Sequence, residues 1–423
     1  MIVRGLRWYI VALVSCGTIL NYLARNSLGV LAPTLKTTLH ITTQQYSYIV
    51  GAFQGAYTLM QPVCGGLIDY IGLRFGFALF AVGWSVANML HAVAASWLAL
   101  AVFRALLGAT EAAAIPAGMK AIASWFPRRE RSIATGYFNA GTSFGALLAP
   151  PLVGFVSLYF SWRAAFVVTG GLGLIWAAVW LWLYRSPSQH PAITTAERDM
   201  IAADRNLRQN GAPVSPMRPG VILRSSRFWT LAVPRFLAEP AWQTFSFWIP
   251  LYLSTERGFD IKSIALFAWL PFLAADLGGI LGGYLSPFFM RAFGLSLVSS
   301  RVLGIFLGAI CMIAPGSVMF AHGHVAVIAL FSIGGFAHQI ISVLINTLTA
   351  DLFPEEQVGL ANGLVGQAGW LGGLIFSLAI GQLAETVGYG PLFACLSLFD
   401  LVGAVYLFLM VRHYGLASSA KDS

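Results

Sequence analysis

At least six ionisable residues interrupt stretches of sequence that are otherwise apolar. They are Arg25, Arg104, Glu111, Arg235, Glu239 and Asp276. In a dehydrated cavity a guanidinium can hold a carboxylate through two parallel hydrogen bonds, and a carboxyl can take up and release a proton. The pattern therefore indicates a site for a small anion, for protons, or for both.

Arg25 is the first candidate for binding the anion. It lies in the first apolar stretch beside Tyr22 and Asn26, which can add hydrogen bonds to a bound carboxylate. The alternative is a structural ion pair between Arg25 and an acid of another helix. The sequence leaves both readings open.

Arg104 and Glu111 stand two helical turns apart, so they share one face of a helix. We expect Glu111 to carry the coupled proton, because it lies deep within an apolar stretch. A permanent ion pair of Glu111 with Arg104 or Arg25 is the alternative. For Arg104 itself a structural role is favoured.

Arg235 and Glu239 are spaced for a pair on one helix surface, and Pro240 follows and frees a backbone carbonyl. The pair either neutralises itself or forms part of a site. In the second case Arg235 assists with a carboxylate, and Glu239 accepts sugar hydroxyls together with Gln243. The indole of Trp242 suits the C–H face of a sugar, although it could equally pack in a core.

Further polar side chains occur within predicted apolar helices. The additional binding candidates are Tyr57, Asn139, His338, Gln339 and Gln367. Such groups often only bond a neighbouring helix, so each is a weak candidate by itself. The sequence does not separate a gating role from a coupling role for Asp276, and it favours a structural role for Asp400.

The composition excludes a water-soluble globular domain. Hydrophobic residues make up 58% of the chain, charged residues only 10%, and the mean hydropathy is +0.75. A helix that crosses a hydrocarbon core about 30 Å thick needs about 20 apolar residues. The sequence predicts an all-α membrane protein with twelve such helices, near residues 8–35, 47–69, 75–95, 98–122, 134–157, 163–184, 229–253, 262–289, 300–320, 324–349, 358–384 and 389–411.

The helices divide into two halves. A six-helix bundle is expected over residues 1–184, a polar linker over 185–228, and a second bundle over 229–423. The run Gly65-Gly66 with Arg74 recurs as Gly282-Gly283 with Arg291 at equivalent places. Parallel six-helix repeats related by a pseudo-two-fold axis place a binding site at their interface.

Basic residues gather in loops on one predicted side of the membrane, which the positive-inside rule assigns to the cytoplasm together with both termini. These residues are Arg4, Arg7, Arg74, Arg128, Arg129, Arg131, Arg291, Arg301, Arg412 and those of the linker. The acidic loop 351–357 lies on the same side and disagrees, but acids weigh little in that rule. The net charge of +9 is thus a topology signal and not a nucleic-acid surface.

Motifs for other functions are missing from the sequence. The four cysteines lie far apart in predicted helices without metal-ligand spacing, so we expect no disulfide, metal or cofactor. Neither H-E-x-x-H nor G-x-S-x-G occurs, which argues against an enzyme. A channel would favour repeated pore-lining rings over two asymmetric halves.

The run Gly65-Gly66-Leu67-Ile68-Asp69-Tyr70-Ile71-Gly72-Leu73-Arg74 resembles the loop signature of the major facilitator superfamily between helices 2 and 3. In that signature an acid and basic residues hold helices together on the cytoplasmic side. Here Tyr70 and Leu73 replace usually basic residues. The resemblance implies a cytoplasmic gate of Asp69, Arg74, Glu130 and Arg131.

Further runs resemble the anion:cation symporter family and, within it, bacterial hexuronate transporters. They are residues 21–26 and 125–131 for the family, and 5–9, 43–49, 234–242 and 334–339 for the hexuronate group. The resemblance implies a monomeric inner-membrane symporter, surrounded by lipid, that imports galacturonate and glucuronate with the proton gradient. Galactonate-type relatives carry an aspartate where this chain has Ala24, which leaves the proton stoichiometry open. The alternative is transport of another sugar acid or organic anion on the same fold.

Overall fold

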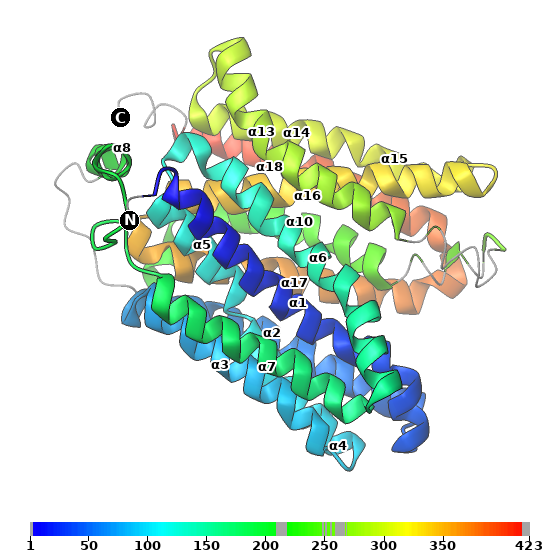
Figure 1. Cartoon of the computed structure of the whole chain (residues 1–423). Coiled ribbons are helices and arrows are strands. Elements are labelled where there is room, and N and C mark those ends of the chain that lie inside the picture. Colours follow the sequence, from blue (N-terminus) through cyan, green and yellow to red (C-terminus); the bar gives the residue numbers. More distant parts are fainter. Residues whose placement is uncertain are drawn as a thin grey trace. The chain divides into compact units, whose positions relative to one another are not determined.

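The computed structural model describes residues 3–208, 218–247, 249, 252–253, 256–258, 267 and 269–416, and this part of the chain is helical without a named strand (Figure 1). Its α-helices are α1 (Leu6–Thr38), α2 (Thr43–Ile71), α3 (Leu73–Leu90), α4 (Trp97–Glu111), α5 (Ala114–Trp125), α6 (Arg128–Tyr159), α7 (Trp162–Leu183), α8 (Thr195–Arg208), α9 (Pro219–Arg224), α10 (Ser226–Phe247), α13 (Leu270–Phe293), α14 (Leu297–Cys311), α15 (Ile313–Gly316), α16 (His324–Leu352), α17 (Val358–Val387) and α18 (Tyr389–His413). Within the described residues, 10 spans are long and apolar enough to cross a membrane. The predicted all-α membrane fold is confirmed, whereas the count of twelve stays a prediction because the helix expected at 262–289 begins outside the described residues.

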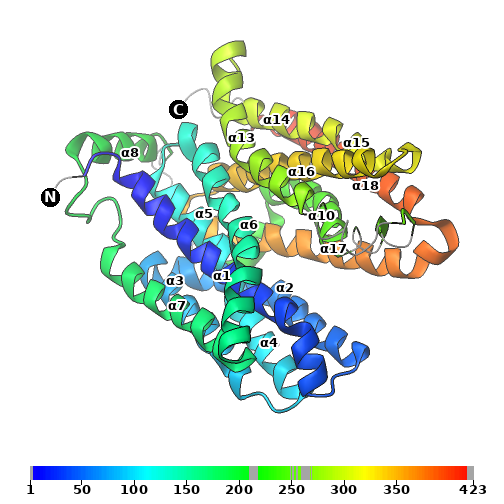
Figure 2. The same cartoon turned by 45° about the vertical axis from the view of Figure 1, so that its right-hand side comes forward.

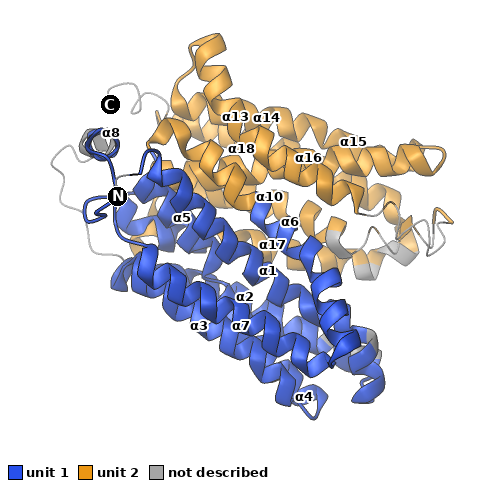
Figure 3. Ribbon diagram, viewed as in Figure 1, with its two compact units in different colours: residues 1–126, 140–217, 354–364 blue, residues 127–139, 218–353, 365–423 orange. Residues whose placement is uncertain are grey.

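The chain forms two compact units that are interleaved in the sequence (Figure 3). Unit 1 contains residues 1–126, 140–217 and 354–364, and unit 2 contains 127–139, 218–353 and 365–423. The division falls within α6 and within α17, so each of these helices contributes its first turns to one unit and its remainder to the other.

A proline divides the helix that the sequence predicts at 98–122. The structure has α4 and α5 there, separated by a turn at Ala112 and Ala113. Pro116 has no N–H to offer the carbonyl of Ala112 four residues earlier, and its ring crowds that carbonyl. The helix therefore ends at Glu111, and this carboxyl lies next to an irregular turn. Unit 2 has the corresponding break between α14 and α15, where Pro315 follows.

Glycines bring helices of unit 1 into close contact. A Cβ added to Gly108 on α4 would collide with the backbone carbonyl of Phe53 on α2. Small residues of this kind allow membrane helices to approach closely. The contact sets the distance between α2 and the face of α4 that carries Arg104 and Glu111.

The first part of the predicted linker packs on the start of α1 (Figure 2). The buried carboxylate of Glu197 on α8 accepts hydrogen bonds from the backbone N–H groups of Leu6 (3.0 Å) and Arg7 (3.1 Å). It also forms an ion pair with the Arg7 guanidinium at 2.8 Å. The first N–H groups of a helix have no partner within the helix, so Glu197 supplies an acceptor for two of them.

Candidate functional site

Arg25 on α1 and Glu111 at the end of α4 form an ion pair in unit 1. The Arg25 Nε lies 2.9 Å from Glu111 Oε2, and the Glu111 side chain is fully buried. Of the two readings of Arg25, the structure contains the ion pair. The same contact leaves Glu111 Oε1 without a hydrogen-bond partner among the described residues.

Aromatic rings surround the Arg25 guanidinium. Its Cζ lies 4.2 Å from the ring centre of Tyr22, 4.8 Å from that of Tyr57 and 5.2 Å from that of Phe53. A desolvated guanidinium gains about 2 kcal/mol from such a ring face, and its planar shape suits stacking. Two predicted residues, Tyr22 and Tyr57, are thus brought to Arg25. Phe53 was missed, although it stands one helical turn before Tyr57 on the same face.

Arg104 supports the backbone at Arg25. Its terminal nitrogen donates to the carbonyl of Arg25 at 2.8 Å, and its Cζ lies 5.0 Å from the Phe53 ring. This contact agrees with the structural role favoured for Arg104. The side-chain amide of Asn26 already has a hydrogen-bond partner, because it donates to the Tyr22 carbonyl at 2.7 Å.

Unit 2 contains a second cationic cluster, between α10 and α16. The Arg235 guanidinium donates to Ser342 Oγ at 2.8 Å and lies 2.8 Å from a carboxylate oxygen of Glu239. The predicted pairing of Arg235 with Glu239 is present. Ser342 was missed, because a serine in an apolar helix gives no signal that distinguishes it from a packing residue.

Polar and aromatic groups extend this cluster. The Trp242 and His338 rings stack with centres 5.5 Å apart and planes 15° apart. His338 Nδ1 and Gln339 Oε1 are buried without a hydrogen-bond partner among the described residues. The buried Gln243 lies against Gly373 on α17, where an added Cβ would collide with its Cγ. The structure thus places four predicted candidates of α10 and α16 near one another: Arg235, Glu239, Trp242 and His338.

Three further candidates of unit 2 lie on other helices. Asn139 is buried on α6, whereas Asp276 on α13 and Gln367 on α17 are partly exposed. Their roles stay predictions. The described residues contain no group of three or more His, Cys, Asp and Glu side chains that could hold a metal ion.

Asp69 at the end of α2 joins three segments of unit 1. Its carboxylate lies 2.6 Å from Lys120 Nζ of α5 and accepts hydrogen bonds from the N–H groups of Gly359 (3.2 Å) and Leu360 (2.7 Å) at the start of α17. Arg74 instead donates to the carbonyl of Leu181 through two nitrogens. Lys120 was missed, although a lysine within a predicted apolar helix is the kind of signal used for Arg104.

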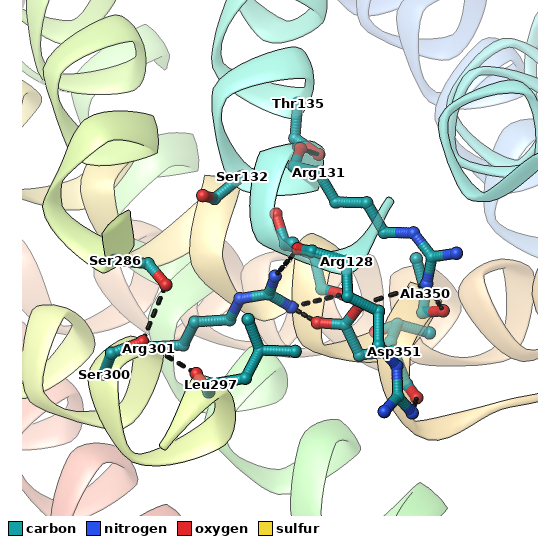
Figure 4. A network of polar contacts seen from close by, with 12 residues as sticks. Arg128, Arg131, Ser132, Thr135, Ser286, Leu297, Ser300, Arg301, Ala350 and Asp351 are labelled. Atoms are coloured by element: carbon teal, nitrogen blue, oxygen red, sulfur yellow. Dashed lines mark hydrogen bonds and ion pairs between the residues drawn. The ribbon is translucent and has the colours of Figure 1, made fainter. Parts of the chain in front are cut away.

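Asp351 lies between two buried arginines of unit 2 (Figure 4). Arg131 lies 3.1 Å from one of its oxygens, and Arg301 forms an ion pair with the other. Arg301 also donates to the Arg128 carbonyl at 2.6 Å. The acidic loop that disagreed with the charge rule therefore has a structural task, since its first residue compensates two buried charges. Glu130 is partly exposed in the first turn of α6.

Comparison with known proteins agrees with this helical architecture. The family described as Major Facilitator Superfamily matches residues 14–322. The "Hexuronate transporter" of Escherichia coli (strain K12) is 49% identical over 422 residues, which are 100% of this chain and 98% of the relative. The "Galacturonate transporter" of Dickeya chrysanthemi is 48% identical over 326 residues, 77% of this chain and 94% of the relative. The solved structure of the Escherichia coli fucose:proton symporter FucP is similar in fold, with a TM-score of 0.73, 14% identity and coverage of 95% of this chain and 98% of that chain.

Proposed function

Because the chain belongs to the major facilitator superfamily, we propose that it carries hexuronates such as galacturonate and glucuronate across the bacterial inner membrane together with protons. Two transporters of these sugar acids share about half of their residues with it. Membership of this superfamily makes the protein a multi-pass membrane transporter and not an enzyme.

The Arg25–Glu111 ion pair carries the proposal. Arg25 is a buried guanidinium whose partner is a carboxyl of the protein itself. A hexuronate also presents a carboxylate, so it competes with Glu111 for the same nitrogen atoms. Protonation of Glu111 removes its charge, weakens the ion pair and leaves the guanidinium for the substrate. Proton binding and substrate binding then favour each other, as linkage requires.

Unit 2 contributes to sugar recognition in this proposal. Arg235 is paired with Glu239 and donates to Ser342 of α16, and the unpartnered atoms of His338 and Gln339 lie about one helical turn before Ser342. Sugar hydroxyls both donate and accept, so they can satisfy such groups. The rings of Trp242 and His338 offer apolar faces for the C–H groups of the sugar.

Transport requires the protein to alternate between two gate states with different affinities for proton and substrate. We assign the gate to Asp69 and Arg74 in unit 1 and to Glu130 and Arg131 in unit 2. The contacts of Asp69 with Lys120 and of Arg131 with Asp351 support this assignment, because both join separate segments of their unit through buried charges. Asp276 stays a candidate for gating or coupling.

Counterflow in proteoliposomes tests the substrate. Vesicles loaded with unlabelled galacturonate should accumulate radiolabelled galacturonate, and external glucuronate should inhibit this uptake. Galactonate and gluconate have open chains and should inhibit at least about tenfold more weakly, a difference of about 1.4 kcal/mol. Stronger inhibition by galactonate than by either hexuronate would assign the protein to another sugar acid.

Reporter fusions test the topology. A fusion after Arg208 and another at Ser423 should both report the cytoplasm, as the basic loops predict. A periplasmic signal at either position would contradict the cytoplasmic assignment of the linker and the C-terminus.

A further inference from the structure

A cavity of about 280 Å³ lies in unit 1, away from the Arg25 cluster. It is formed by the start of α3, one side of α5, the segment after α7 and the segment before α17. The polar residues that line it include Arg74, Lys120, Ser124, Arg185, Gln189 and Glu355. The proposed transport mechanism uses Arg74 and the Asp69–Lys120 contact in the gate, but it places no ligand in this cavity.

Positive charge is in excess around the cavity. Three lining residues are basic (Arg74, Lys120 and Arg185), one is acidic (Glu355), and Asp69 pairs with Lys120, so these five side chains formally carry one net positive charge. Glu355 accepts a hydrogen bond from Ser124 Oγ at 2.7 Å. Arg74 and Arg185 both donate to the carbonyl of Leu181, at 2.6 Å and 3.0 Å.

Neither Arg74 nor Arg185 forms an ion pair with a carboxylate among the described residues. Two guanidinium groups on one carbonyl repel each other, so an anion bound between them would be stabilised by both. Guanidinium groups bind phosphate oxygens through paired hydrogen bonds.

The backbone of α3 adds donors at the same place. Gly72 is the N-cap of α3 and offers no side-chain hydrogen bond, and both Gly72 and Leu73 line the cavity. The first N–H groups of a helix have no acceptor within the helix, and the helix dipole favours negative charge there. These backbone N–H groups are independent of the two arginines, and they also favour a negatively charged ligand.

The cavity meets the lipid-facing surface at Phe75. Its ring lines the cavity and is 61% exposed, and Leu79, Val82 and Val86 continue the exposed stripe along the same face of α3. The neighbouring helix α7, which packs along α3 in Figures 1 and 2, has Trp182 in its last turn, and this residue is 75% exposed. Aromatic residues at such positions mark the level of lipid headgroups.

We propose that this cavity binds the phosphate of an anionic phospholipid from the leaflet on the side of the N-terminus. The phosphodiester lies between Arg74 and Arg185, and the acyl chains follow the apolar stripe of α3. Basic pockets between membrane helices bind anionic headgroups in this way. A free phosphate ester shares the same chemistry, and its contribution is measured separately below.

Native mass spectrometry of the detergent-purified full chain tests the proposal. Phosphatidylglycerol should remain bound at least about tenfold more tightly than phosphatidylcholine with the same acyl chains. Arg74→Gln and Arg185→Gln should remove most of this preference. Arg291→Gln, at the corresponding place in the second repeat and outside the cavity, should keep it. Equal retention of phosphatidylglycerol by the wild type and both cavity variants overturns the proposal.

A second pair of variants tests the site while Arg74 and Arg185 keep their hydrogen bonds to the Leu181 carbonyl. Gln189 lines the cavity and has an exposed side chain. Gln189→Arg should tighten phosphatidylglycerol binding, and Gln189→Glu should weaken it, each by several-fold. Unchanged binding in both variants counts against the site.

A competition arm separates the two sources of phosphate. Glycerol 3-phosphate or inorganic phosphate at millimolar concentration should displace phosphatidylglycerol only weakly, because neither has acyl chains to place along α3. Displacement by glycerol 3-phosphate at the concentration at which the lipid itself binds would overturn the lipid assignment in favour of a soluble phosphate ester.

Discussion

The Arg25 side chain lies 2.9 Å from the Glu111 carboxylate, while the Arg25 carbonyl accepts a hydrogen bond of 2.8 Å from Arg104. Helix α4 therefore holds both the backbone and the side chain of this arginine from residues two turns apart. Loss of the Glu111 charge releases the guanidinium, but Arg104 still fixes the position from which it extends. This arrangement allows Arg25 to exchange one carboxylate for another without a movement of α1.

Arg25→Lys should lose most transport although it keeps the positive charge. An ammonium cannot provide bidentate geometry or stack between Tyr22 and Tyr57 as the planar guanidinium does. Loss of one charge-assisted hydrogen bond of about 1.5–3 kcal/mol predicts galacturonate binding weakened by about 10- to 100-fold. Calorimetric titration of the purified variant measures this. Near-normal binding by Arg25→Ala would remove Arg25 from the site.

Glu111→Gln should abolish uphill accumulation and retain exchange. The amide imitates the protonated acid permanently, so Arg25 is free for substrate but no proton is released inside. Counterflow of labelled galacturonate should stay within about threefold of wild type, less than 1 kcal/mol in barrier height.

Uptake by Glu111→Gln against a gradient under an imposed proton-motive force would transfer the coupling role to Glu239 or Asp276. Loss of counterflow together with poor expression would instead favour a purely structural ion pair.

Two buried aspartates of unit 2 should respond in opposite ways to the same substitution. Asp351→Asn removes the carboxylate charge that the buried Arg131 and Arg301 share, and breaking a buried ion pair of this kind costs about 3–5 kcal/mol. Asp400 is buried with neither carboxylate oxygen hydrogen-bonded among the described residues, so Asp400→Asn removes an uncompensated acid and should leave stability unchanged or raise it. Thermal unfolding in detergent compares them. Equal destabilisation by both would show that Asp400 has a partner as strong as those of Asp351.

Gly108→Ala should destabilise unit 1, because the new methyl group meets the Phe53 carbonyl and forces α2 away from α4. Overpacking of this kind costs about 1–3 kcal/mol. Gly51→Ala on α2 is the matched control, since nothing lies within 4 Å of its added Cβ. The control should melt at or slightly above the wild-type temperature, by the helix preference of alanine. A Gly108→Ala protein as stable as the control would contradict the close contact.

Residue types and helical spacing were enough to predict the all-α fold and the pairing of Arg235 with Glu239, and they singled out Arg25 and Glu111 as site candidates. Charged residues in apolar helices are costly, so each is a strong signal by itself. Pairing across helices was harder, because periodicity gives the face of a helix but not its neighbour. The sequence therefore left Arg25 with several possible partners, and the structure identifies Glu111.

The contacts of Asp69 and Asp351 were harder to predict from the sequence, for physical reasons. Lys120 and Asp69 are distant in sequence, and the third partner of Asp69 is backbone N–H, which every residue has. Asp351 was read as part of an acidic loop on the cytoplasmic side, although α16 extends through Leu352 and buries it beside Arg131. The helix break at Ala112 follows from Pro116, which the sequence analysis did not use because the apolar composition continues across it.

The cap that Glu197 provides for α1 also has a consequence for biosynthesis. The two residues that it joins, Arg7 and Glu197, are 190 positions apart, and the ribosome adds about 5–20 residues per second. The ribosome therefore adds Glu197, the acceptor for the first N–H groups of α1, roughly 10–40 s after it adds Arg7. By then every helix from α1 to α7 has been synthesised. Docking of α8 can therefore occur only after the helices from α1 to α7 have been synthesised.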